Sequence, residues 1–486
     1  MIRREDVERR LEERGLPASW QGSPPPGFEA LRLDSRAVRP GDLFCAVRGT
    51  RVDGHDFLSA ARAAGAAAAV VERAGDADGL PRLVVSDTRA ASAHLAALFA
   101  GDPARTLHVV GITGTNGKTT TALLVRHLLS ELGPAAALGT LGVIAPDGGR
   151  VEGRLTTPDP LELADRLRSL VAAGVRYLGM EVSSHALVQR RVEAVPFAAA
   201  LFTNLTRDHL DYHADMAEYR DAKLRLLSLL GPDGTAIFNA DEPAWQGAGV
   251  GRSPVRFGIS STADVRAVDV EPGPTGSAWT LETPEGAARV RLPLLGAFNV
   301  ANALGAAAAA RAAGLPVAAI AEALSRAPQV PGRMEILART PSLVVRDYAH
   351  TPDALERAIE ALRPTVAGRL IVVFGAGGDR DPGKRPLMGR IATSGADLAI
   401  VTSDNPRTED PEAIVRAIVA GLEPGEWEAI VDRREAIARA LALAAPGDAV
   451  LLAGKGHETY QEVGGERLPF DEEVIVTEIL SGGTVA

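Results

Sequence analysis

The sequence is poor in cysteine and has no long apolar run. Cys45 is the single cysteine among 486 residues, which excludes an internal disulfide framework and a metal cluster built on cysteines. No uninterrupted apolar stretch approaches the roughly 18 residues that a transmembrane helix needs. The N-terminal residues, MIRREDVERRLEERG, carry charges of both signs and lack the apolar centre of a signal peptide. We therefore expect a cytoplasmic protein that has no membrane partner.

Basic residues are outnumbered by acidic ones, 52 to 62, which gives a net charge of −10. This balance argues against a nucleic-acid partner, because non-specific binding to nucleic acid needs a basic surface. An anionic small molecule remains possible, since local arginines can hold its charge. With 46% hydrophobic and 23% charged residues, the composition is that of a folded globular protein.

Lysine is the scarce basic residue. It occurs only at Lys118, Lys223, Lys384 and Lys455, so 52 − 4 leaves 48 arginines. A lysine amine is compact and can lose its proton and be modified, which a guanidinium cannot do. Any one of the four could be an accident, but all four fall in the motifs described below. We therefore expect lysine to be required at these places.

The length predicts about three domains, at roughly 100–200 residues each. Segments such as LRLDSRAV, RLIVVFGA and LAIVTS read as strands. Strand-like and helix-like segments alternate along the whole chain, which predicts α/β domains with parallel sheets. A Pro/Gly break, PQVPGR, precedes the last third. The expected domains are residues 1–103, 104–330 and 331–486.

A glycine-rich loop between a strand and a helix carries the strongest motif. Residues 111–120 read GITGTNGKTT. Such a loop wraps phosphate oxygens with backbone N–H groups, its lysine reaches the β- and γ-phosphates, and Thr119 can hold Mg²⁺. The strict pattern has glycine where Ile112 stands, so this is a variant loop. One alternative is a glycine-rich turn that binds no ligand. Another is a nucleotide switch or motor protein that uses the same loop. The predicted ATP-binding residues of the loop are Gly114, Thr115, Asn116, Gly117, Lys118, Thr119 and Thr120.

TGTNGKTTT, followed downstream by MEVSSHAL and TNLTRDHLDYH, resembles the Mur ligase family. These ATP-dependent enzymes join an amino acid to a UDP-linked muramyl peptide during peptidoglycan precursor synthesis. LDSR, AKLRLL, DYAHTPDAL, FGAGGDRDPGKRPLMG, DNPR and GKGHETYQ are similar to the members that add the third peptide residue. The resemblance covers almost the whole chain and implies a UDP-binding N-terminal domain, a central P-loop ATPase domain and a C-terminal Rossmann-like domain, in a monomer. Another ligase, such as a folylpolyglutamate synthetase, is the rival; LDSR and DNPR argue against it.

The resemblance implies four catalytic residues: Lys118, Glu181, His209 and Lys223. It implies Mg²⁺ on Thr119, Glu181, His209 and Lys223, with the lysine as a CO₂-derived carbamate. A carbamate suits a hard cation, whereas an ammonium would repel it. By the residues alone, Glu181 could cap a helix, His209 could form only local hydrogen bonds, and Lys223 could be an exposed helix lysine that pairs with Asp221.

The implied reaction forms an acyl phosphate from a substrate carboxylate and ATP, and the incoming amine then displaces phosphate. No enzyme nucleophile is needed. The sequence Ser183-Ser184-His185 looks like part of a triad, but neighbours on a strand alternate between faces. We therefore expect Ser184 to contact the substrate instead.

The UDP-sugar peptide needs hydroxyls and arginines for its oxygens and anionic groups. For Leu33 and Val52, simple core packing is the alternative. The residues that the resemblance assigns to this substrate are Leu33, Ser35, Thr50, Arg51, Val52, Thr156, Thr157, Ser184, Gln189 and Arg191.

Further ATP contacts are implied around the second boundary. An asparagine amide can pair with an adenine edge, although asparagines near a helix start are often caps. An arginine brought in by domain movement would clamp the phosphates, and closure would exclude water where the three domains meet. The implied residues are Asn299, Asn302, Arg333, Asp347, Tyr348 and His350.

The segment DNPR resembles that of members which add meso-2,6-diaminopimelate. A guanidinium fork can take the distal carboxylate of this substrate, whereas lysine and ornithine end in an ammonium group. Both remain alternative substrates, and Arg407 could instead pair with Glu409 or Asp410 at the surface. The implied amino-acid-binding residues are Arg380, Asp404, Asn405, Pro406, Arg407, Gly454 and Glu458.

Overall fold

The computed structural model describes residues 1–49, 52–75, 79–259 and 263–482. They form two compact units. Unit 1 consists of Met1–Arg266 with Thr283–Glu285 and Ala301–Ile320, and unit 2 of Ala267–Glu282, Gly286–Val300 and Ala321–Ala486. Among the described residues, no helix combines the length and the apolar character needed to cross a membrane.

The N-terminal part of unit 1 is a five-stranded sheet with the order β2-β7-β6-β5-β4. β4 to β7 pair in parallel and β2 is antiparallel at the edge. Leu43 and Cys45 face a cluster with α1 and α3, whereas Phe44 faces α2, as strand alternation requires. The elements are β1 (Ile2–Arg3), α1 (Arg4–Glu13), β2 (Ser19–Gln21), β3 (Gly27–Phe28), β4 (Leu31–Arg32), β5 (Leu43–Cys45), α2 (Leu58–Ala63), β6 (Ala68–Val71), β7 (Arg82–Val84) and α3 (Thr88–Phe99).

The second sheet of unit 1 has parallel strands at its centre, in the order β9-β12-β8-β13-β14-β15. β10 and β11 add an antiparallel edge. α5 covers one face, where Leu163, Leu167 and Leu170 pack against Leu178 and Met180. The elements are β8 (His108–Thr113), α4 (Lys118–Leu129), β9 (Ala135–Gly139), β10 (Gly142–Ile144), β11 (Arg150–Val151), α5 (Pro160–Ala172), β12 (Tyr177–Glu181), α6 (Ser184–Val188), β13 (Phe197–Phe202), α7 (Met216–Leu224), β14 (Leu230–Asn239) and β15 (Val255–Gly258).

Three further strands and two helices follow in the chain. β16 begins in unit 1 and continues into unit 2, and α8 runs from unit 2 into unit 1. The alanine-rich sequence of α8 gives a helix in which six of the nine alanines are buried. The elements are β16 (Val265–Gly273), β17 (Gly276–Thr283), β18 (Gly286–Leu292), α8 (Ala297–Ala312) and α9 (Val317–Ser325).

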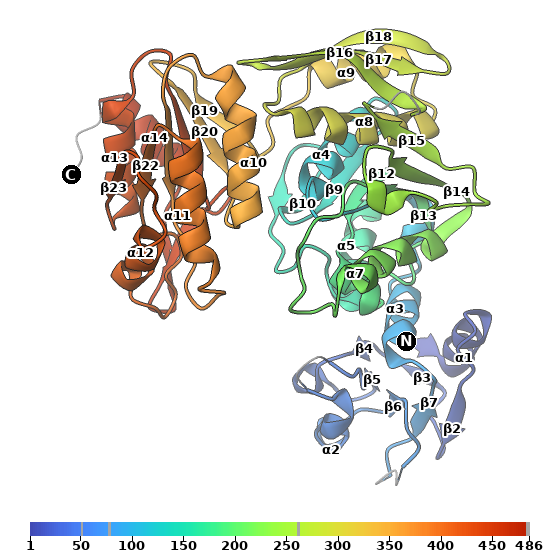
Figure 1. Ribbon diagram of the computed structural model, residues 1–486. Coiled ribbons are helices and arrows are strands. Elements are labelled where there is room, and N and C mark those ends of the chain that lie inside the picture. The colour runs from blue at the N-terminus through green and yellow to red at the C-terminus, as the bar shows by residue number, and fades with distance from the viewer. Residues whose placement is uncertain (50–51, 76–78, 260–262, 483–486) are drawn as a thin grey trace. The chain divides into compact units, whose positions relative to one another are not determined.

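The C-terminal part of unit 2 is a six-stranded sheet, β19-β20-β24-β21-β22-β23, with helices on both faces (Figure 1). Leu370, Val372 and Phe374 pack against α10, α11 and α12, whereas Ile371 and Val373 pack against α13 and α14. Strands buried on both faces explain the continuous apolar run LIVVF. The elements are β19 (Glu335–Ala338), β20 (Leu343–Asp347), α10 (Pro352–Leu362), β21 (Leu370–Phe374), α11 (Lys384–Gly395), β22 (Leu398–Val401), α12 (Pro411–Val419), β23 (Trp427–Ala429), α13 (Arg433–Leu443), β24 (Ala449–Ala453), β25 (Tyr460–Val463), β26 (Glu466–Pro469) and α14 (Glu472–Leu480).

The α/β class and the parallel sheets are confirmed, with antiparallel strands added at sheet edges. One predicted strand is mostly wrong: LRLDSRAV keeps only β4, because Asp34 accepts a hydrogen bond from the Arg36 backbone N–H and starts a 3₁₀ turn. The bounds of the three domains stay a prediction.

Candidate active site

The phosphate loop joins β8 to α4, as the sequence predicts. Asn204, which follows β13, holds the backbone of this loop. The Thr115 N–H donates to the Asn204 carbonyl at 2.8 Å, and the Asn116 N–H donates to the Asn204 side chain at 2.9 Å. The Lys118 ammonium donates to the carbonyls of Gly114 at 3.0 Å and Thr115 at 2.7 Å. The loop therefore holds its lysine beside its own backbone, at the N-terminus of a helix.

Two glycines of this loop have no room for a side chain. A Cβ at Gly114 would collide with the Thr203 hydroxyl, and one at Gly117 would collide with the Asn302 amide oxygen. Gly117 also has a φ of +83°, which glycine adopts without strain. The close approach of backbone to neighbouring side chains explains why these two positions are glycine.

Glu181 is the last residue of β12 and is only 2% exposed. Its carboxylate accepts hydrogen bonds from the Thr119 hydroxyl at 3.1 Å and from the Thr140 backbone N–H at 2.8 Å and hydroxyl at 3.1 Å. Glu181 therefore does not cap a helix. It links the start of α4 to the loop after β9, beside the phosphate loop.

Lys223 lies on α7 and is 1% exposed. Its Nζ donates to the Gly114 carbonyl at 2.8 Å and lies 4.3 Å from the centre of the Tyr219 ring. Burial, and then the nearby charge of Lys118, hold the Lys223 pKa well below its usual range. The alternative of an exposed helix lysine is therefore wrong, since the side chain is buried against the phosphate loop.

His209 follows β13 in a loop and has a φ of +55°. Its ring lies nearly perpendicular to the His185 ring, with 4.9 Å between centroids, and its Nε2 lies 3.5 Å from the Asp208 carboxylate. Burial lowers the pKa of His209 and lowers that of His185 to about 4. Both imidazoles are therefore neutral at pH 7, the form in which a histidine can bind a metal.

The donors assigned to Mg²⁺ suit a hard cation only in part. The Thr119 hydroxyl and the Glu181 carboxylate are oxygen ligands and touch one another. Among the described residues, no group of three or more His, Cys, Asp or Glu side chains is placed to hold a metal ion. A cation here would therefore depend on phosphate oxygens, and Lys223 fits it only as a carbamate.

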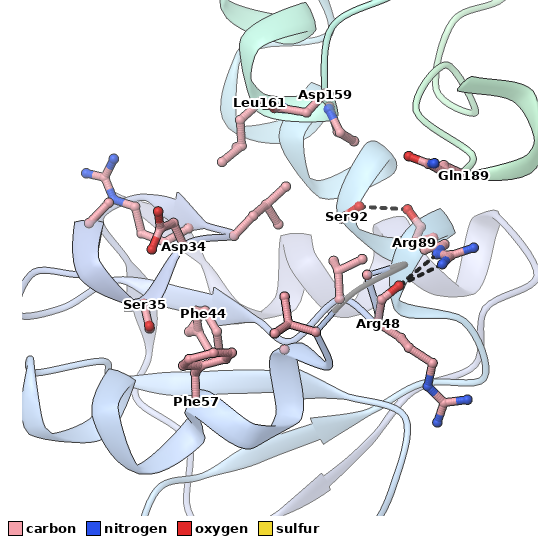
Figure 2. A pocket seen from close by; sticks show the side chains of 18 of the residues that line it. Asp34, Ser35, Phe44, Arg48, Phe57, Arg89, Ser92, Asp159, Leu161 and Gln189 are labelled. Carbon is pink, nitrogen blue, oxygen red and sulfur yellow. Dashed lines mark hydrogen bonds between the residues drawn. The ribbon is translucent and has the colours of Figure 1, made fainter. Parts of the chain in front are cut away.

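A cavity of about 960 Å³ opens in unit 1 between the N-terminal sheet and the start of α5. Figure 2 shows Asp159 and Leu161 on the opposite side of this cavity from Phe44 and Phe57. Of the residues assigned to the UDP-sugar peptide, five line the cavity: Leu33, Ser35, Val52, Gln189 and Arg191. Val52 is 61% exposed, so core packing does not explain it.

Arg191 is held at the cavity wall by neutral oxygens. Its guanidinium donates to the Gln189 side chain at 2.6 Å and to the Thr157 carbonyl at 2.8 Å. Burial lowers its pKa, although a guanidinium remains charged. Because these two hydrogen-bond partners are neutral, they do not balance the charge of Arg191, which is therefore suited to bind an anionic ligand.

The remaining residues of this set lie elsewhere. The Thr157 hydroxyl donates to the Glu181 carbonyl at 3.0 Å, Thr156 contacts Thr140 at 3.2 Å, and Ser184 shares a hydrogen bond with His213 at 3.0 Å. These three residues therefore surround Glu181 and the histidines rather than the cavity. Thr50 and Arg51 lie outside the described residues.

Ser183 to His185 do not lie on a strand, so that part of the sequence argument was wrong. β12 ends at Glu181, and the Ser183 hydroxyl accepts a hydrogen bond from the Ala186 N–H at 3.2 Å as the cap of α6. The Ser184 hydroxyl bonds the Nε2 of His213, but among the described residues the Nδ1 of His213 has no hydrogen-bond partner, so the third member of a triad is not seen.

Sequence reasoning missed several arginines that line the cavity. Arg89 donates to the Arg48 carbonyl at 2.7 and 3.1 Å, as Figure 2 shows. Arg32 pairs with Asp42 at 2.8 Å. Forty-eight arginines hide these among many surface ones, and only the neighbouring LDSR motif gave a signal for this region.

In unit 2, two loops meet around a buried lysine. The Lys455 Nζ donates to the Asn405 side chain at 2.8 Å and lies 3.2 Å from Glu458 and 4.0 Å from Asp404. Asn405 also donates to Glu458 at 2.7 Å. A Cβ at Gly454 would collide with the Asp404 carboxylate. The structure thus brings together four residues assigned to the amino acid.

Arg407 lies at the rim of the same cluster, with Pro406 buried behind it. Its guanidinium donates to the Gly378 carbonyl at 2.6 Å and lies 3.4 Å from Glu462. Glu409 pairs instead with Arg385 at 2.8 Å, so the suggested surface pairing of Arg407 with Glu409 is wrong. Arg380 is exposed, and its assignment to the amino acid stays a prediction.

Four residues assigned to ATP lie together at the end of β20. The Arg333 guanidinium lies 4.7 Å from the centre of the Tyr348 ring, and the His350 ring nitrogen Nδ1 is 2.7 Å from the Tyr348 carbonyl. Burial raises the pKa of Asp347 to about 6 and that of Tyr348 to about 12. The Lys384 ammonium donates to the His350 carbonyl at 2.8 Å, which connects this group to α11.

The two asparagines assigned to the base lie in α8, but they serve different neighbours. Asn299 donates from its side-chain amide to the Leu295 carbonyl at 2.7 Å, just before the start of α8. Asn302 accepts a hydrogen bond from Thr121 at 3.4 Å and lies against Gly117. Asn302 therefore lies beside the phosphate loop.

Three family models match successive parts of the chain: "Mur ligase family, catalytic domain" at 28–100, "Mur ligase middle domain" at 112–310, and "Mur ligase, glutamate ligase domain" at 332–456. The UDP-N-acetylmuramoyl-L-alanyl-D-glutamate–2,6-diaminopimelate ligase of Gloeobacter violaceus is 47% identical over 457 residues, 93% of each chain. That of Geobacillus kaustophilus is 44% identical over 473 residues, 95% of this chain and 96% of its own. A solved structure titled as the same ligase has a TM-score of 0.69 at 36% identity, over 94% of this chain and 95% of its own. By these matches, the chain belongs to the Mur ligase family.

Proposed function

We propose that the chain is an ATP-dependent ligase which adds meso-2,6-diaminopimelate to UDP-N-acetylmuramoyl-L-Ala-D-Glu in peptidoglycan precursor synthesis. One observation carries the proposal: the chain has both a phosphate loop and Arg407 in one segment with Asp404 and Asn405. It is also 47% identical to a ligase of that name. The guanidinium of Arg407 supplies the fork that a distal carboxylate needs, whereas the ammonium of lysine or ornithine would be repelled.

The reaction proceeds in two displacements. An oxygen of the substrate carboxylate attacks the γ-phosphorus of ATP, the bond to the bridging oxygen breaks, and ADP leaves. The neutral amine of diaminopimelate then attacks the acyl carbon, the acyl C–O bond breaks, phosphate leaves, and the amine gives its proton to solvent. Lys118 and the backbone N–H groups of its loop offset charge on the phosphoryl oxygens.

Thr119, Glu181, His209 and a carboxylated Lys223 would hold Mg²⁺, which offsets negative charge on the phosphates when bound. The low pKa of Lys223 supports the carbamate, because only a neutral amine can react with CO₂. The Nζ forms a bond to the carbon of CO₂, one C=O π bond opens to give a carboxylate whose single negative charge is shared by both oxygens, and a proton leaves to solvent. Arginine cannot undergo this reaction, which explains lysine at this position.

The remaining assignments belong to the same proposal. Leu33, Ser35, Thr50, Arg51, Val52, Thr156, Thr157, Ser184, Gln189 and Arg191 bind the UDP-linked substrate. Asn299, Asn302, Arg333, Asp347, Tyr348 and His350 contact ATP, and Arg380, Gly454 and Glu458 join the DNPR segment in binding the amino acid. The chain works as a monomer of three domains, 1–103, 104–330 and 331–486, in the cytoplasm, where ATP and its nucleotide-linked substrate are available.

Phosphate release tests the proposal. The purified chain is given ATP and Mg²⁺, and each of the other two substrates is omitted in turn. We expect release only when the UDP-linked dipeptide and diaminopimelate are both present. Release with ATP alone would instead fit a nucleotide switch or motor, and the proposal would be wrong.

A further inference from the structure

Arg433, the first residue of α13, is fully buried at 0% side-chain exposure and touches two carbonyls. Its Nη2 donates to the Ala453 carbonyl at 2.9 Å, and its Nη1 makes a longer contact of 3.4 Å with the Ser403 carbonyl. Ala453 directly precedes Gly454, and Ser403 directly precedes Asp404. One guanidinium therefore bridges the ends of the two strands, β24 and β22, from which the amino-acid loops leave.

The charge of Arg433 is matched by Glu472, the first residue of α14. The Glu472 carboxylate accepts from the Arg433 Nε at 2.9 Å and lies 2.8 Å from its Nη2, and it too has 0% exposure. A fully buried ion pair is a poor device for stability, because removing both charges from water offsets most of their attraction. Apolar residues of similar volume would hold α13 to α14 at least as well, so stability alone does not account for the pair.

The two loops that Arg433 bridges fit against each other closely. A Cβ at Gly454 would meet the Asp404 carboxylate, and it would lie 4.0 Å from the Arg433 Nη2. Lys455 and Asn405 form the next contact between the loops, at 2.8 Å. A small change in the separation of the strand ends would therefore move Asp404, Asn405 and Glu458 relative to one another.

We infer that Arg433 is a positioning residue of the amino-acid site. Through its contacts with the Ser403 and Ala453 carbonyls it fixes the separation of the 403–407 and 454–458 loops, and Glu472 is its counter-ion. The inference rests on the proposed function for the identity of the amino acid. It assigns the C-terminal helix α14 a part in substrate recognition. Misplacement of a binding group by about 1 Å can cost about 100-fold in rate, so the bridge has a large effect without touching the substrate.

A double variant separates positioning from stability. Arg433→Met with Glu472→Leu removes both charges and leaves a buried apolar pair, which is expected to preserve folding. We expect KM for diaminopimelate to rise about 10- to 100-fold, with KM for ATP and for the UDP-linked dipeptide within about threefold of wild type. Thermal unfolding reports on the fold of the same samples.

The matched control is Arg434→Met with Glu478→Leu. These residues also join α13 to α14, at 2.6 Å, but they are 40% and 49% exposed and are not seen to touch either loop. The control should keep all three KM values. If the double variant does not fold, Arg433→Lys repeats the test, because lysine keeps the charge beside Glu472 but cannot reach both carbonyls. Its KM for diaminopimelate should rise while the other two KM values stay near wild type.

A variant at Arg433 that folds and keeps its wild-type KM for the amino acid would overturn the inference, and so would an equal rise in all three KM values. The comparison uses whichever amino acid the wild-type chain turns over. Rejection of diaminopimelate by the wild type would therefore defeat the proposed substrate and leave the test of Arg433 intact.

Discussion

Lys223 in unit 1 and Lys455 in unit 2 are equally buried, at 1% and 0% exposure, yet their surroundings are opposite. Lys223 faces a carbonyl and a tyrosine ring, with the charge of Lys118 nearby. Lys455 faces Asn405, Glu458 and Asp404. The first setting favours a neutral amine that can react, whereas the second surrounds the amine with an amide oxygen and two carboxylates. Burial of a lysine therefore does not reveal its role until the charges around it are known.

The largest effect is expected for Lys118→Arg. The substitution keeps the positive charge near Lys223 but puts a wider planar group beside the Gly114 and Thr115 carbonyls. We expect kcat to fall by about 100- to 1000-fold, as for loss of a donor that stabilises developing charge. Steady-state ATP turnover measures it, with circular dichroism as the check on folding. Near-normal turnover would show that the loop does not grip phosphate.

Arg407→Ala removes the charge proposed for the distal carboxylate and leaves the Lys455 cluster in place. Loss of one partner of a charge pair costs about 2–5 kcal/mol, or about 30-fold or more in KM for diaminopimelate. KM for ATP should stay near its wild-type value. Glu409→Ala is the control, because Glu409 pairs with Arg385 and not with Arg407. An unchanged KM for diaminopimelate in Arg407→Ala would exclude the assignment.

The two buried lysines should respond differently to added carboxylic acids. Lys223→Ala should lose about 10- to 100-fold in activity, as for loss of a group that supports a metal site, and millimolar acetate should restore part of it by replacing the carbamate. Lys455→Ala should lose activity and gain nothing from acetate, since it removes a cation. Phosphate release with and without acetate measures both. Rescue of both variants, or of neither, would remove the distinction.

The last expected effect is on stability against pH rather than on activity, and it concerns His94 on α3. Burial, and then Arg14 and Arg10, lower the pKa of His94 to about 4, below its usual value of about 6.5. The folded state therefore binds fewer protons, so stability is present above pH 6.5 and is lost as pH falls toward 4. The loss should reach up to about 3 kcal/mol, at about 1.4 kcal/mol per pKa unit. Denaturant unfolding of His94→Gln should show a flatter pH dependence between pH 7 and 4; an equal slope would rule His94 out.

Local patterns predicted much of the fold and the phosphate loop. Apolar runs such as LIVVF and LAIV are buried strands, and the loop before Lys118 is contiguous in sequence, so its spacing alone carries its geometry. The predicted strand at LRLDSRAV failed because the Asp34 carboxylate accepts a hydrogen bond from the Arg36 backbone N–H, which competes with strand pairing.

Contacts between distant segments were beyond the sequence. Arg433 lies 39 residues from Glu472 and 20 from Ala453, and nothing in its local pattern separates it from Arg434. Lys455 was marked by the scarcity of lysine, but its partners 50 residues away were not visible. The sequence also did not reveal the partners of the cavity arginines, because Arg89 bonds the Arg48 carbonyl and Arg32 pairs with Asp42, in other segments of the chain.

The central claim is that this ligase selects diaminopimelate, and competition between amino acids tests it most directly. Equal concentrations of meso-2,6-diaminopimelate, L-lysine and L-ornithine are offered together with ATP, Mg²⁺ and UDP-N-acetylmuramoyl-L-Ala-D-Glu, and the UDP-linked product is weighed by mass spectrometry. We expect a product that carries diaminopimelate almost alone. A product that carries mainly lysine or ornithine would contradict it.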